Sequence, residues 1–221
     1  MGWRERGLAA SASLLVGTAI AVSPTPAECP PAGPPTGGCW ESALGQRLLY
    51  VHVPLAWVAY AGFLVAAIAA GLVLVREDER AGRWMRAANE TTTVFAAAAL
   101  ASGLAWSYEF PIYDPLTDAK VQATFVLVAA LAGLWTLAAS ADPSKRDRLV
   151  ASLTPVAFLA VPASYYASRL VSPHPDFLRE TDLGAGMGTS LVLATIGFAA
   201  LWLLTTWVRR RILRLEEERS W

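Results

Sequence analysis

Six long apolar blocks divide this chain, and they constrain its fold more than any other feature. Their lengths are close to the ~20 residues that a helix needs to cross the ~30 Å hydrocarbon core of a bilayer. Backbone groups inside lipid must be bonded within their own segment, so each block is expected to be helical. The sequence therefore predicts an all-α polytopic membrane protein whose residues 1–221 form a single integral membrane domain. The predicted spans are 7–23, 48–75, 92–106, 121–140, 149–170 and 183–208.

The remaining composition argues against several classes of function. Charged residues make up only 16% of the chain, against roughly 25% in an average soluble domain. The formal net charge of zero gives no electrostatic reason to expect nucleic-acid binding. The sequence contains no P-loop, no dinucleotide fingerprint and no Cys-x-x-Cys pair. It shows no catalytic constellation either, because neither a Ser–His pairing nor a His-x-x-x-His spacing is present, so an enzyme is not expected.

The first apolar block has two interpretations. Arg4 and Arg6 precede a modest apolar stretch that leads into Pro-rich sequence, which is also typical of a cleavable signal peptide. The stretch 23–29 has no clear small-x-small cleavage site, and this favours a retained first helix.

Basic residues gather on alternate connections between the blocks. The positive-inside rule places such connections in the cytoplasm, and with six spans both termini are then cytoplasmic. The protein is accordingly expected in the plasma membrane as a multi-pass protein with its functional face extracytoplasmic. The predicted cytoplasmic residues are Arg4, Arg6, Arg76, Arg80, Arg83, Arg86, Lys145, Arg146, Arg148, Arg209, Arg210, Arg211, Arg214 and Arg219; Arg47, Lys120, Arg169 and Arg179 lie on the other side.

The only two cysteines, Cys29 and Cys39, fall in the first predicted outer loop. That side of the membrane is oxidising enough for a structural disulfide, which is the favoured interpretation. Free or redox-active thiols are the alternative.

The only two histidines are predicted on the same membrane face. His52 lies near the outer end of the second block, where an ionisable group is a functional candidate, although an interfacial His bonded to a carbonyl explains it too. Pro54 is expected to open this helix or loosen its first turn. His174 lies between Pro173 and Pro175 in the third outer loop, where it also fits an ordinary surface histidine. Two neutral imidazoles on one face suit axial ligation of a haem iron, or binding of a soft metal.

An aromatic stretch between the histidines falls in the second outer loop. An aromatic belt at headgroup level explains one or two of its residues, whereas a platform for a flat macrocycle explains the whole stretch. Its acidic residue either orients a ligand or starts a turn. The stretch comprises Trp106, Tyr108, Phe110, Tyr113 and Asp114.

The motif around His52 resembles that of the CcmC family, the haem-handling proteins of cytochrome c maturation. Residues 50–57 read Y-V-H-V-P-L-A-W, close to the family's Y-x-H-V-P-x-A-W, and the resemblance extends over about 44–210. His174, which follows Arg169, resembles the family's second outer histidine. The resemblance implies that His52 and His174 are the axial ligands of the haem iron.

The tryptophan-rich outer loop of that family, W-G-x-x-W-x-W-D-x-R-L-T, is only partly matched, in residues 106–117. Asp114, Leu116 and Thr117 agree with it, Tyr113 replaces a Trp, and the motif's Arg is absent. The resemblance further implies a transient haem b, a haem chaperone as acceptor and ABC-type partner subunits.

The expected function is therefore haem binding at the outer membrane face and haem delivery for cytochrome c maturation. Arg47, Lys120 and Arg169 are the candidate contacts of the propionates. A small-solute permease and a membrane haem b electron-transfer subunit are the alternatives. No charged residue inside a block supports the permease, and the electron-transfer subunit would usually place its histidines deep in facing helices.

Overall fold

The computed structural model describes residues 2–21, 43–107, 114–170 and 186–219, and within these ranges the backbone is helical with no strand. The elements are α1 (Trp3–Ala21), α2 (Ala43–Arg76), α3 (Glu79–Ser107), α4 (Ala119–Ser140), α5 (Pro143–Phe158), α6 (Ala160–Leu170) and α8 (Met187–Arg219).

Four helical stretches are long and apolar enough to cross a membrane, namely Arg47–Arg76, Ala119–Ser140, Lys145–Tyr166 and Met187–Arg219. Large apolar side chains are exposed along them, among them Ile68, Phe125 and Ile196, and these suit contact with lipid rather than water. The prediction of an all-α polytopic membrane protein is confirmed.

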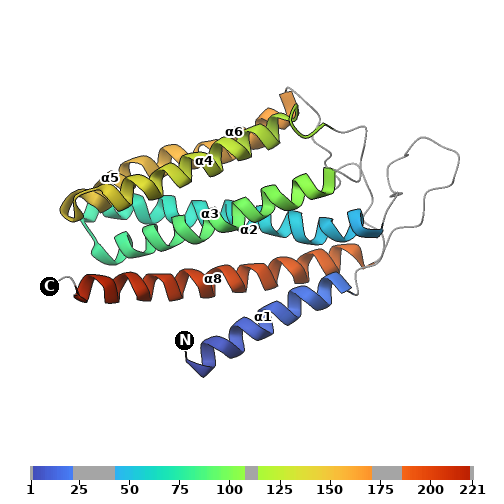
Figure 1. Cartoon of the computed structure of the whole chain (residues 1–221), viewed down its shortest axis with the longest axis horizontal. Coiled ribbons are helices and arrows are strands. Elements are labelled where there is room, and N and C mark those ends of the chain that lie inside the picture. The colour runs from blue at the N-terminus through green and yellow to red at the C-terminus, as the bar shows by residue number, and fades with distance from the viewer. Residues whose placement is uncertain (1, 22–42, 108–113, 171–185, 220–221) are drawn as a thin grey trace, which may run out of the picture.

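The other two predicted spans correspond to α1 and α3, which are not among these four stretches. The reason lies in their composition, since α1 is rich in Ala, Ser and Gly, and α3 begins with charged turns and carries Thr at 91, 92 and 93. Both helices nevertheless run alongside the apolar ones (Figure 1). α3 also begins well before the predicted span at 92, because its polar first turns pack against the polar last turns of α8.

The helices form an elongated bundle around α2, α3 and α8, which all contact one another (Figure 1). α1 packs on the outer side of α8, α5 packs on α2 and α3, α4 packs on α3 and α5, and α6 packs on α4 and α5. Both chain termini lie at the same end of the bundle, here called the terminal end (Figure 1). The opposite end, where α3 and α6 finish and where α2, α4 and α8 begin, is called the distal end.

The fifth predicted span is broken into α5 and α6 at Leu159. Pro155 and Pro162 cause the break, because proline has no N–H for the helical ladder and its ring collides with the preceding turn. The N–H of Leu159 is shared between the carbonyls of Pro155 and Val156, at 3.3 and 3.2 Å, and the ladder resumes when Ala163 donates to Leu159. The distal half of this span is thus a separate short helix.

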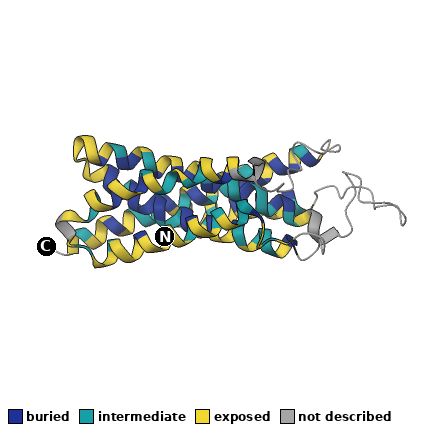
Figure 2. Ribbon diagram, turned by 90° about the horizontal axis from the view of Figure 1, so that it is seen from above, coloured by how far each residue is buried: buried dark blue, intermediate teal, exposed yellow. Residues whose placement is uncertain are grey.

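Close packing at the centre of the bundle depends on a glycine. The indole Nε1 of Trp202 on α8 donates to Oγ1 of Thr92 on α3 at 2.9 Å, and both residues are buried. Gly62 of α2 lies directly against this pair, so that an added Cβ would be 2.8 Å from the indole nitrogen and closer still to the threonine hydroxyl. The buried residues follow the axis of the bundle, and the exposed ones lie outside (Figure 2).

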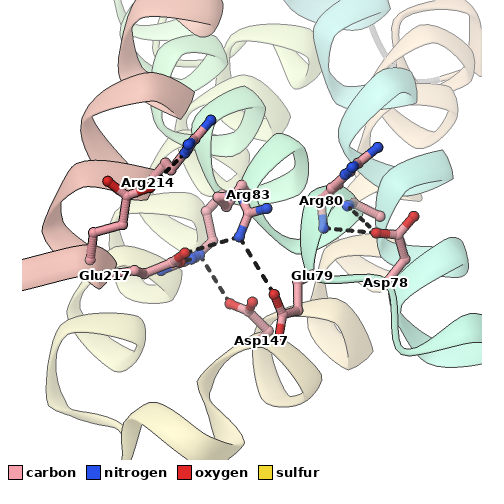
Figure 3. A network of polar contacts seen from close by, with 10 residues as sticks. Asp78, Glu79, Arg80, Arg83, Asp147, Arg214 and Glu217 are labelled. Carbon is pink, nitrogen blue, oxygen red and sulfur yellow. Dashed lines mark hydrogen bonds and ion pairs between the residues drawn. The ribbon is translucent and has the colours of Figure 1, made fainter. Parts of the chain in front are cut away.

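The terminal end is held by ion pairs among α3, α5 and α8. Arg83 contacts Glu217 at 3.0 Å, and Arg86 contacts both Glu217 and, at 3.0 Å, Asp147. Figure 3 shows Arg83, Asp147 and Glu217 converging from three helices. α1 is tied to the same end through Glu5, which is 2.8 Å from Arg211 of α8. These charged side chains would be costly to leave unpaired in lipid, and they are paired with one another at the terminal end of the bundle.

Removing the carboxylate that Arg83 and Arg86 share is expected to destabilise the bundle. We predict that Glu217→Ala lowers the free energy of unfolding by about 1–2 kcal/mol, because Arg86 is left buried with one partner fewer while Glu217 itself is partly solvated. Thermal unfolding of the purified protein in detergent measures this. Glu218→Ala is the matched control, because Glu218 pairs with the exposed Arg214, and equal losses from the two variants would contradict the prediction.

Filling the space at Gly62 is expected to separate the central helices. We predict that Gly62→Ala costs about 1–3 kcal/mol, since the new methyl group overlaps the Trp202–Thr92 pair. Gly71→Ala, on the same helix with open space around it, is expected to be neutral or slightly stabilising. If both substitutions change the thermal midpoint by the same amount, α2 does not pack against the Trp202–Thr92 pair.

Candidate functional site

His52 lies inside α2, near its distal end. The helix begins at Ala43 and continues through Pro54, whose side chain is fully buried. The expectation that Pro54 opens this helix is wrong, because the residues from Ala43 onward already form helical turns before it. The apolar stretch of α2 begins at Arg47, so at 1.5 Å per residue His52 lies roughly 8 Å into it.

The imidazole of His52 bonds to the backbone of α3. Its Nδ1 is 2.8 Å from the carbonyl oxygen of Ala99. A carbonyl oxygen only accepts, so Nδ1 carries the proton and donates it. In the neutral ring Nε2 then holds the lone pair, which is the form that ligates a metal.

Ser102 and Gly103 also lie beside the ring. The hydroxyl of Ser102 is 3.4 Å from Nδ1 of His52 and donates to the Ala99 carbonyl at 2.9 Å. Gly103 lets the ring approach α3 closely, since an added Cβ would be 2.7 Å from Cε1 and 3.0 Å from Nδ1. We call Ala99, Ser102 and Gly103 the α3 contact site of His52.

Trp106 extends the same face of α3 toward the distal end. Residues 99, 103 and 106 follow the spacing that places side chains on one side of a helix. Trp106 is 9% exposed, so its indole lies within the bundle rather than in the surrounding lipid. The structure therefore brings two of the predicted residues, His52 and Trp106, to the same end of the α2–α3 pair.

The turn that leads into α4 is built by two aspartates. Oδ1 of Asp114 accepts from the N–H of Leu116 at 3.0 Å, and the Asp114 carbonyl accepts from Thr117. Asp118 caps α4 by accepting from the N–H groups of Lys120 and Val121, at 2.8 and 3.0 Å. Asp114 thus starts a turn in this structure. Asp118 was missed by the sequence reasoning, although an Asp just before an apolar run is a typical N-cap signal.

The remaining predicted residues divide into three groups. Arg47 is exposed and Lys120 is half-buried, and both lie at the distal end. Arg169 lies in α6, but its side chain is not among those described. The residues outside the described ranges are Cys29, Cys39, Tyr108, Phe110, Tyr113 and His174.

The donor set around His52 fits an axial ligand of haem. A ligating histidine typically donates its other N–H to a carbonyl or carboxylate, and His52 does so to Ala99. Among the described residues no group of three His, Cys, Asp or Glu side chains could hold a metal ion by itself. Haem iron needs no such group, because the porphyrin supplies four of its ligands and the protein only the axial ones.

The α3 contact site itself was not predicted. Ser102 and Gly103 interrupt an Ala-rich block, which is the only signal that the sequence gives for them. Whether these two residues contact His52 depends on the register between α2 and α3, which a single sequence does not specify.

Comparison with known proteins identifies one family whose model matches this chain. The model of the family described as "Cytochrome C assembly protein" matches residues 1–175, a range that includes α1 to α6 and both histidines. No curated protein matches the chain. The family match supports a role in cytochrome c maturation and agrees with the resemblance to CcmC. Because the match covers most of its length, this chain belongs to the cytochrome C assembly protein family.

Proposed function

We propose that this protein binds haem b transiently at the distal face of its bundle, with His52 and His174 as axial ligands, and hands it on in the manner of CcmC. The observation that carries the proposal is the bond from Nδ1–H of His52 to the Ala99 carbonyl. It selects the tautomer whose Nε2 lone pair binds iron, and it holds the ring on a rigid helix.

The second ligand comes from a different part of the chain. α6 ends at Leu170 at the distal end, and His174 follows four residues later. Four residues of chain span at most about 14 Å, and this limit on the distance from Leu170 supports a second ligand at the distal end. Two histidines from separate segments suit a haem clasped between them.

The other contacts of haem follow from its shape and charge. The macrocycle is flat and apolar, so Trp106, Tyr108, Phe110 and Tyr113 are the proposed stacking residues. The two propionates are anionic, and Arg47, Lys120 and Arg169 are the proposed cations that meet them. Arg47 precedes His52 by five residues on α2 and is exposed at the distal end, where a propionate would reach water.

The distal face is proposed to be extracytoplasmic, in the plasma membrane. The terminal end carries Arg76, Arg80, Lys145 and Arg148, all exposed, and the basic last turns of α8. Excess Lys and Arg near span ends mark the cytoplasmic side. Haem is then presented on the side where cytochromes c mature.

Haem handling requires release as well as binding. His52 is fixed by its α3 contact site, whereas His174 belongs to a predicted loop, so we assign the first step of release to His174. The acceptor is proposed to be a haem chaperone, with ABC-type subunits as further partners, as in CcmC-type systems.

Loss of either histidine is expected to change the haem spectrum. We predict that His52→Ala abolishes haem binding or weakens it at least about tenfold, since the helix-borne ligand is removed. His174→Ala is expected to retain haem with a shifted Soret band. Absorption spectra of the purified full chain, titrated with haemin in detergent, measure both effects.

Tyr60→Phe is the matched control for these variants. Tyr60 lies on α2 two turns beyond His52, and its hydroxyl makes a weak contact, at 3.4 Å to Ser164. Its loss is expected to leave the spectrum unchanged. A Soret band that is indifferent to both histidine substitutions would refute the haem proposal, and solute transport by haem-free protein would support a permease instead.

The orientation gives a separate prediction. In a background with Cys29→Ser and Cys39→Ser, Leu116→Cys is expected to react with a membrane-impermeant maleimide in intact cells, since Leu116 is 74% exposed at the distal end. Arg80→Cys, exposed at the terminal end, is expected to react only after permeabilisation. The reverse pattern would place the distal face in the cytoplasm.

A further inference from the structure

The α3 contact site of His52 has features that haem ligation alone does not require. We propose that Ser102 and Gly103 are positioning residues for His52, with Ser102 strengthening the iron-binding nitrogen and Gly103 fixing the orientation of the ring. This inference rests on the proposed function, because it concerns how one axial ligand is held.

The hydroxyl of Ser102 presents a lone pair to His52. It has a single proton, which it donates to the Ala99 carbonyl at 2.9 Å. Toward Nδ1 of His52, 3.4 Å away, it can therefore act only as an acceptor. Nδ1–H thus faces two oxygens, the nearer being the Ala99 carbonyl at 2.8 Å.

Two acceptors at Nδ1–H change how strongly the other ring nitrogen, Nε2, binds a metal. Partial withdrawal of the Nδ1 proton raises the electron density at Nε2 and makes the imidazole a stronger ligand. A more basic axial ligand stabilises ferric over ferrous iron, which lowers the reduction potential. Ser102 is therefore expected to favour tight binding of the oxidised haem.

Gly103 controls where the ring can lie. An added Cβ would be 2.7 Å from Cε1, 3.0 Å from Nδ1 and 3.6 Å from Nε2 of His52, so it would meet the Cε1–Nδ1 edge of the imidazole. The imidazole is rigid, and its attachment to α2 leaves it few alternative rotamers. To avoid the new methyl group the ring must move away from α3, which breaks the bond to Ala99 and turns Nε2.

A purely structural role predicts something different. If Gly103 only allowed α2 and α3 to pack, its substitution would lower stability and leave the haem spectrum of the folded protein as it was. The spectrum and the reduction potential therefore separate positioning from packing.

The test uses the full chain in detergent, loaded with haemin, with Soret position, electron paramagnetic resonance and redox titration as readouts. We expect Ser102→Ala to raise the reduction potential and weaken ferric haem binding about tenfold. Ser102→Thr keeps the hydroxyl and is expected to restore both values. Gly103→Ala is expected to shift the Soret band and alter the low-spin signal, whereas Gly133→Ala, with open space around it, is expected to match the native protein.

Each outcome decides between the inference and the function on which it rests. If His52→Ala loses haem while Ser102→Ala and Gly103→Ala keep the native spectrum and potential, the inference is wrong and the proposed function stands. If His52→Ala itself keeps the native spectrum, both fail. If Gly103→Ala does not fold, which size-exclusion chromatography reports, the comparison of Ser102→Ala with Ser102→Thr decides the assignment.

Discussion

The burial of α3 is the constraint on which the rest of this bundle depends. Its middle carries polar side chains that lipid would leave without hydrogen-bond partners, at a cost of several kcal/mol for each unsatisfied group. Neighbouring helices supply partners to several of these groups: Thr92 accepts from the Trp202 indole at 2.9 Å, and the Asn89 amide nitrogen donates to Thr154 of α5, also at 2.9 Å. α3 therefore has to lie among α2, α5 and α8, and the positions of these helices follow from its polar sequence.

The same burial produces the candidate site. The contact with α2 that shields the middle of α3 continues to its distal turns, where the Ala99 carbonyl meets His52 at 2.8 Å. The terminal turns of α3 are held by charges through Arg83 and Arg86. α3 thus joins a charged end, a polar middle and an end that contacts His52. A change in the tilt of α3 would therefore move the contacts of His52.

The sequence predicted the parts of this structure that depend on local pattern. Block length and hydropathy located the apolar stretches of α2, α4 and α8, and the motif around His52 by itself indicated the family. What the sequence could not predict depends on the register between helices. The early start of α3 at Glu79 and the role of Gly103 each require a partner that is remote in sequence. The continuation of α2 through Pro54 was also missed, since proline more often marks a helix start.

The two proposed ligands come from separate elements of the chain, and this division suits the proposed release of haem. In a symmetrical site with two ligands fixed on rigid helices, haem leaves only if the bundle opens, which costs the packing at Gly62 and Gly103. In the proposed site one ligand lies on α2 and the other, His174, follows α6 in the chain, so the two ligands do not share one helix. The break at Leu159 separates α6 from the part of the span that Asn89 and Arg86 anchor, so the helix that precedes the second proposed ligand is not continuous with that anchored part.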